Sequence, residues 1–136
     1  MNEFAAEWYD DEKTILLLTY PKTFEASALI AWSNTELMAL IDEVDHPVVL
    51  VTDANQAEVP RGILAAIPEL RAGIKLMDHP QYVGQVFFNL NRLGEHAARL
   101  WALFDYQSFH ADTFEAALEK ARAKRTEALD KGLRAR

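Results

Sequence analysis

The stretch Pro47-Val48-Val49-Leu50-Val51-Thr52-Asp53 decides the fold. Its four central residues are apolar, three of them are β-branched, and a polar pair follows them. A strand with one wet face alternates apolar and polar residues, so this unbroken run indicates a strand buried on both faces, as in a parallel sheet covered by helices. In such sheets, ligands and partners bind beyond the carboxyl ends of the strands. We therefore expect function at Thr52, Asp53 and the loop at residues 54–62.

Four further segments are predicted to be strands, at residues 6–9, 14–20, 82–90 and 106–110. A polar turn separates the first two, which are expected to form a hairpin, and Gly84 in the third marks a bulge or a close backbone approach. Strands that alternate with helices imply a largely parallel sheet. The sequence therefore predicts an α/β fold. The single domain is expected to contain a mixed, largely parallel sheet of four to five strands and about four helices.

The spacing of apolar residues predicts these helices. The first is expected over residues 25–44, with Thr23 as its N-cap. The second, over residues 63–74, contains Pro68, which either kinks the helix or divides it in two. Asn91 is expected to cap the third helix. The buried stripe of that helix is expected to consist of Leu93, Ala97, Leu100 and Phe104.

Charge is distributed unevenly along the 136 residues, which are expected to form one domain over 1–136. The residues up to Leu118 include seven basic and 18 acidic ones, whereas residues 119–136 include seven basic and three acidic ones. The overall charge of −7 argues against nucleic-acid binding.

Asp112 and Glu115 have the spacing of a capping box at the start of the last helix. Residues 125–136 are expected to form a basic tail that is helical or frayed.

Several classes of site are excluded or disfavoured. Without cysteine, the chain has no disulfide, cysteine-ligated zinc or catalytic thiol, and it suits a reducing, cytoplasmic environment. No apolar run approaches the roughly 20 residues that span a bilayer, so no membrane insertion is expected, and no signal peptide is recognised. No two of the four histidines have the spacing that places metal ligands on one helical face. We therefore expect neither a metal nor a cofactor.

Three phrases carry a resemblance to a known family: His46-Pro47-Val48-Val49-Leu50-Val51-Thr52-Asp53, Val59-Pro60-Arg61-Gly62 and His79-Pro80-Gln81-Tyr82-Val83-Gly84. Together with the element order, they resemble the STAS, or SpoIIAA-like, anti-sigma-factor-antagonist fold, most closely an uncharacterised bacterial group with that fold. The likeness extends to about Lys124. In the typical antagonist domain, a partner kinase phosphorylates a serine or threonine that precedes a glycine. This chain keeps Asp53 and Gly62 but has Pro60 and Arg61 where the hydroxyl is expected, so the resemblance implies an interaction module without the usual phosphorylation switch.

The loop before the second helix has a physical means of recognising an anion. If Pro60 is the first helical residue, the free amides of Arg61, Gly62 and Ile63 face the loop, and the helix dipole favours a carboxylate or phosphate there. The alternative is that Arg61 pairs with an acidic neighbour, Asp53 or Glu58, and only holds the loop.

The predicted function is therefore a non-catalytic, regulatory protein-interaction module, and no enzymatic constellation is recognised. Its partner-binding residues are expected to be Thr52, Asp53, Asn55, Pro60, Arg61 and Gly62. Self-association into a homodimer is expected to use an exposed patch that includes Trp32 and Trp101.

The alternative function is a carrier or sensor of a small ligand, either an anion or a lipid-like molecule, as in lipid-binding relatives of the fold it resembles. A pocket bordered by Thr52, Asn55 and Asn89 at the carboxyl end of the sheet would favour this alternative. A deep cleft that holds a histidine hydrogen-bonded to a carboxylate would instead favour an enzyme.

Overall fold

The computed structural model describes residues 3–105 and 107–131, which alternate between strands and helices. The elements are, in order, β1 (Ala5–Trp8), β2 (Ile15–Thr19), α1 (Ala26–Trp32), the π-helical turn η1 (Ser33–Leu37), α2 (Met38–Ile41), β3 (Val48–Asp53), α3 (Ile63–Gly73), the 3₁₀ turn η2 (Lys75–Asp78), β4 (Tyr82–Phe88), α4 (Arg92–Trp101), β5 (Ser108–His110) and α5 (Phe114–Lys131). None of the helices among these residues is both long and apolar enough to cross a membrane.

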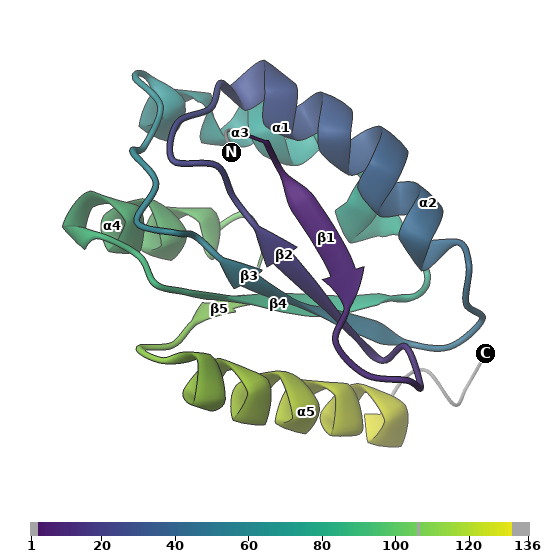
Figure 1. Cartoon of the computed structure of the whole chain (residues 1–136). Coiled ribbons are helices and arrows are strands. Elements are labelled where there is room, and N and C mark those ends of the chain that lie inside the picture. The colour runs from purple at the N-terminus through teal and green to yellow at the C-terminus, as the bar shows by residue number, and fades with distance from the viewer. Residues whose placement is uncertain (1–2, 106, 132–136) are drawn as a thin grey trace.

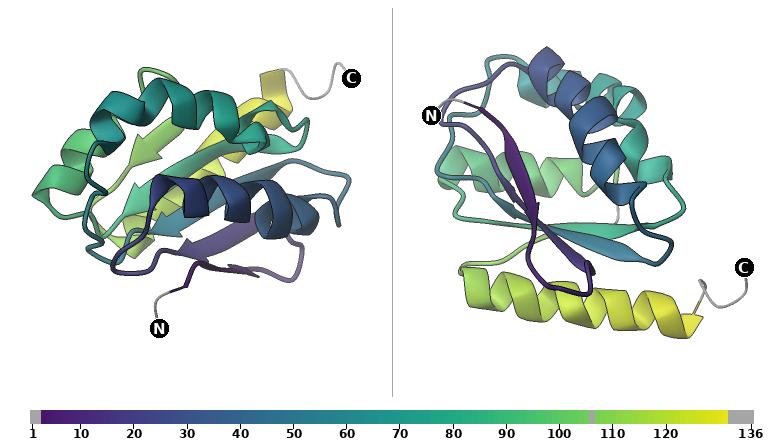
Figure 2. Two further views of the ribbon diagram at one scale, coloured as in Figure 1. Left: turned by 90° about the horizontal axis from the view of Figure 1, so that it is seen from above. Right: turned by 45° about the vertical axis from the view of Figure 1, so that its right-hand side comes forward.

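The five strands form one sheet in the order β1-β2-β3-β4-β5. β1 and β2 pair antiparallel as the predicted hairpin, and the other neighbours pair in parallel. Helices α1 to α4 cover one face of the sheet and α5 covers the other (Figures 1 and 2). The connections from β2 to β3, from β3 to β4 and from β4 to β5 each move to the next strand in the same direction across the sheet. Because such crossover connections are right-handed, their helices all lie on the same face. The predicted α/β class is confirmed.

The strand β3 is buried on both faces, as its apolar run predicted. Val48 and Leu50 pack into the cluster beneath α1 to α3, whereas Val49 and Val51 pack into the cluster beneath α5. All four side chains are at most 1% exposed. The sheet therefore separates two apolar layers, and the larger layer lies on the side of the four shorter helices.

A bulge in β4 changes which side chains face that larger layer. Tyr82 is opposite the first residue of β3, but Gln85 is opposite Leu50, so β4 has one extra residue in this interval. As a result Tyr82 and Gln85, three positions apart, face the same side of the sheet. A side chain at Gly84 would place its Cβ 2.5 Å from the backbone oxygen of Gln107. The close approach predicted at Gly84 is thus confirmed.

The first helical segment is built differently from the prediction. Its N-cap is Glu25 rather than Thr23, and it ends at Ile41. The π-helical turn widens the helix, so residues four apart stay on one side. The buried side chains at that spacing are Leu29, Ser33, Leu37 and Ile41. Trp32, expected in an exposed patch, is only 9% exposed and stacks on Phe4, with ring centroids 5.1 Å apart.

Helix α4 is rotated relative to its predicted buried stripe. Its cap is as expected, since the Asn91 side chain accepts a hydrogen bond from the Gly94 amide at 2.7 Å. Leu93 and Phe104, however, are 50% and 45% exposed. Of the predicted stripe, Ala97 does face the cavity, and it is joined there by Gly94, Ala98 and Trp101. Three of these four residues are small, and they leave space beneath the helix.

Helix α5 begins one residue later than the predicted capping box. The Thr113 hydroxyl, rather than the Asp112 carboxylate, accepts a hydrogen bond from the Ala116 amide at 3.1 Å. The helix then continues to Lys131. Within the segment predicted to be a tail, Arg125 donates to the carbonyl of Pro47 at 2.8 Å. The predicted tail residues 132–136, and Tyr106 in the predicted last strand, lie outside the described residues.

Candidate functional site

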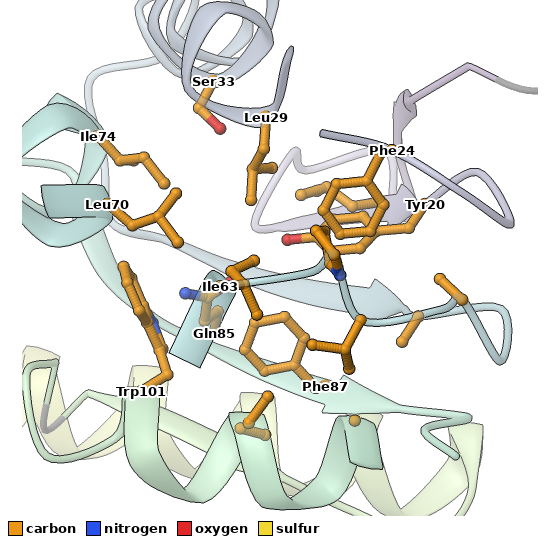
Figure 3. A pocket seen from close by; sticks show the side chains of 18 of the residues that line it. Tyr20, Phe24, Leu29, Ser33, Ile63, Leu70, Ile74, Gln85, Phe87 and Trp101 are labelled. Carbon is orange, nitrogen blue, oxygen red and sulfur yellow. The ribbon is translucent and has the colours of Figure 1, made fainter. Parts of the chain in front are cut away.

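An apolar cavity of about 140 Å³ lies between the sheet and helices α1, α3 and α4 (Figure 3). Each surrounding element contributes side chains to it. Among the lining residues are Tyr20, Phe24, Leu29, Ser33, Ile63, Leu70, Ile74, Gln85, Phe87 and Trp101. The lining is overwhelmingly apolar, so the cavity suits an apolar guest.

Local sequence explains why space remains there. The small residues Gly94, Ala97 and Ala98 form the α4 wall, where larger side chains would reach toward the sheet. On the opposite side, Tyr20 packs edge-on against Phe24 and Phe87, with ring centroids 5.3 and 6.4 Å apart. Rigid rings that pack against one another cannot collapse into the space as a flexible side chain could. The cavity is therefore bounded by rings on one side and by small residues on the other.

A short polar network adjoins the cavity at the sheet. Gln85 lines the cavity and is 8% exposed. The Tyr82 hydroxyl donates to the buried carboxylate of Asp105 at 3.0 Å. Burial raises the pKa of Tyr82 well above its usual value, the charge of Asp105 raises it further, and a hydrogen bond from the Gln85 amide acts in the opposite direction. Tyr82 therefore remains a neutral donor, and Gln85 connects this network to the cavity.

The predicted site residues at the end of β3 hold the following loop in place. Thr52 is fully buried, and its hydroxyl has no hydrogen-bond partner among the described residues. The Asp53 carboxylate accepts from the Asn55 amide at 2.8 Å and from the Asn89 side chain at 2.9 Å. The Asn55 side chain in turn donates to the carbonyl of Tyr20 at 3.1 Å.

These polar groups bind one another rather than line the apolar cavity, although Asn89 borders a separate small pocket with Gln56 and His110. Asn55 and Asn89 both have left-handed backbone conformations, with φ of 56° and 59°, which asparagine adopts more readily than most residues. Neither they nor Thr52 is among the described residues that line the cavity. The pocket expected beside Thr52, Asn55 and Asn89 is thus replaced by a cavity deeper under the helices.

The predicted anion site before α3 has a different geometry. The helix begins at Ile63, and Gly62 is its N-cap with a left-handed φ of +79°, so Pro60 is not the first helical residue. The Ile63 amide, expected to be free, donates to the Pro60 carbonyl at 3.1 Å. Arg61 is exposed and, within the described part of the chain, forms no ion pair with Asp53 or any other residue. Of the three amides expected to be free, the Ile63 amide is therefore bonded, and the alternative ion pair of Arg61 is not observed among the described residues.

A histidine–carboxylate pair does occur, but outside the cavity. The Nε2 atom of His79 lies 2.7 Å from Asp42 Oδ1, and its Nδ1 atom accepts from the Gln81 amide at 3.0 Å. Both ring nitrogens are therefore engaged, and the pair ties α2 to the turn before β4. A general base needs a free nitrogen that reaches a substrate proton, and this geometry offers none.

The two tryptophans expected in an exposed patch, Trp32 and Trp101, both line the cavity instead. The large apolar side chains that are exposed among the described residues are Tyr9, Leu93, Leu103 and Phe104. Trp101 and Gln85 were not predicted as site residues. The run of small residues at 94, 97 and 98 was the available sequence signal for a space beneath α4.

Comparisons with protein-family models, with curated proteins and with solved structures found no match to this chain. The function must therefore be inferred from the geometry and chemistry of the cavity and of the surface beside it.

Proposed function

We propose that this protein binds a small, largely apolar molecule in the cavity beneath α1, α3 and α4, as a carrier or sensor. The cavity itself supports this proposal most directly. Protein interiors are packed as densely as organic crystals and contain few voids larger than a water molecule. An unfilled cavity of about 140 Å³ costs roughly 3 kcal/mol at ~24 cal/mol per Å³. A bound molecule would recover much of that free energy.

The size of the cavity limits the ligand. An engineered apolar cavity of about 150 Å³ in another protein holds benzene. The ligand proposed here is accordingly about the size of a single aromatic ring or a short branched chain. A long acyl chain would have to extend out of the cavity.

The wall nearest the surface is the segment that precedes α3. Phe24, Glu58, Val59 and Pro60 line both the cavity and a shallow surface groove, and Arg61 lies in that groove. These shared residues lie between the cavity and the surface groove. A ligand would therefore reach the cavity by displacement of the segment at residues 58–60.

The test is a thermal unfolding and calorimetric titration series with benzene, toluene and indole. A ligand at 100 times its Kd stabilises the folded state by about 2.7 kcal/mol. We expect this stabilisation in the wild type and its loss in Ala97→Leu, which places a larger side chain on the cavity wall. The matched control is Ala65→Leu, since Ala65 is exposed on α3 and does not line the cavity. If none of the probes stabilises the wild type, the proposal is wrong.

A second candidate function is the protein-interaction module predicted from the sequence. It is favoured by one observation: Arg61 is exposed beside the groove of Thr23, Phe24 and Glu58 and makes no ion pair among the described residues. Arg61→Glu should then abolish capture of a partner from a lysate without change in the unfolding temperature. Arg92→Glu, at another exposed arginine, is the control. Equal capture by both variants and the wild type would contradict this candidate.

A further inference from the structure

We infer that the ligand carries an uncharged oxygen, as a hydroxyl or carbonyl group, which hydrogen-bonds to Gln85 and to the neighbouring indole N–H of Trp101. This inference rests on the proposed function, because it assigns the chemical class of the ligand in the same cavity. It also names the two side chains that select it.

The bulge in β4 places Gln85 at the cavity. Without the extra residue, strand alternation would put Gln85 on the face that α5 covers. The side chain is instead more than nine-tenths buried and lines an otherwise apolar space. A glutamine amide has two N–H donors and one acceptor oxygen. These groups allow the amide to bind a polar atom of a guest.

Trp101 adds a donor that lacks a partner. Its Nε1 atom is buried and has no hydrogen-bond acceptor within the described residues. An indole N–H only donates, so it cannot satisfy itself by accepting from a neighbour. A buried donor without a partner costs roughly 1–3 kcal/mol. In Figure 3, Trp101 and Gln85 lie beside one another at the same side of the cavity, where one ligand oxygen could serve both.

The charge of the lining indicates that the oxygen is uncharged. Glu58 is the one charged side chain among the described lining residues, and it is exposed and acidic. No arginine, lysine or histidine among them could neutralise a buried carboxylate or phosphate. An unpaired buried anion is strongly disfavoured, whereas a hydroxyl or carbonyl needs only its hydrogen bonds. The hydroxyls of Ser33 and Tyr20 also point into the space and add neutral partners (Figure 3).

The experiment compares phenol with toluene, which differ by a hydroxyl in place of a methyl group and have nearly the same shape. Isothermal titration gives both dissociation constants for the wild type, Gln85→Met and Trp101→Phe. Methionine keeps the length of Gln85 but removes the amide. We expect the ratio of toluene Kd to phenol Kd to fall about tenfold in Gln85→Met, which corresponds to one neutral hydrogen bond. Trp101→Phe should lower the same ratio.

The outcomes separate this inference from the proposed function. If the wild type binds neither compound, the proposed function is wrong and the inference with it. If the wild type binds toluene but not phenol, or if neither variant changes the ratio, the cavity binds a ligand but Gln85 and Trp101 do not select an oxygen. Because the ratio compares two ligands on one variant, a general loss of packing does not alter it. Should Gln85→Met fail to fold, Trp101→Phe alone decides the question.

Discussion

Ala97→Leu should make this protein more stable while it removes ligand binding. Ala97 lies on the α4 wall of the cavity, and leucine adds three carbon atoms there. At about 0.8 kcal/mol for each buried carbon, full burial contributes roughly 2 kcal/mol. The cost of the whole cavity, roughly 3 kcal/mol, sets the upper limit. For a chain of this size, a gain of 2 kcal/mol corresponds to a rise in Tm of roughly 6–10 °C.

Urea unfolding at equilibrium measures this gain, and titration with toluene measures binding to the same samples. Ala65→Leu on the exposed side of α3 controls for the change from alanine to leucine in a helix. The expected result is a stabilised Ala97→Leu that no longer binds and an Ala65→Leu that behaves as the wild type. A loss of 1–3 kcal/mol in Ala97→Leu would mean that leucine meets packed atoms rather than free space. That result, or unchanged toluene binding, would refute the reasoning.

Three further predictions concern the sheet and its titratable groups. Gly84→Ala should lower the free energy of unfolding by roughly 1–3 kcal/mol in urea denaturation, because its Cβ would lie 2.5 Å from the carbonyl oxygen of Gln107; equal stability would contradict this close approach. Burial raises the pKa of Asp10, but hydrogen bonds from the turn that follows lower it by more. Its stabilising contribution is therefore present above the unfolded pKa of about 3.9 and is lost as the pH falls through the folded pKa. Asp10→Asn should accordingly be less stable than the wild type at about pH 6, and a difference that did not shrink at about pH 3 would contradict this assignment. Burial raises the pKa of both Tyr20 and Tyr82, so stability should fall as the pH rises above the unfolded value of about 10. In an ultraviolet absorbance titration these two side chains should ionise only as the protein unfolds, and ionisation of more than two of the four tyrosines in the folded protein would contradict this.

The features that the sequence predicted correctly are those with a local cause. The apolar run of β3 specified a doubly buried strand, and the polar turn before Thr14 specified the hairpin. Asn91 could be recognised as a cap because its side chain bonds to an amide only three residues away. Gly84 could be recognised because a missing side chain in a strand points to a close neighbour.

The features that it did not predict depend on parts of the chain that are distant from one another. The cavity is a space that no side chain fills, and its walls come from three strands and three helices. Gln85 faces it only because β4 contains a bulge. The periodicity of helix α4 predicted a stripe that includes Leu93 and Phe104, but the face with the small residues packs inward. The groups around Asp53 were predicted to be a binding site because the sequence does not show that Asn89, from a distant loop, donates a hydrogen bond to Asp53.

Crystals exposed to xenon under pressure would test the central claim most directly, because xenon occupies dry apolar cavities of this size. We predict a xenon peak among Leu70, Phe87 and Trp101 in the wild type, and no such peak in Ala97→Leu. Density for ordered side chains or water in that space, with no xenon, would contradict the presence of an apolar ligand-binding cavity.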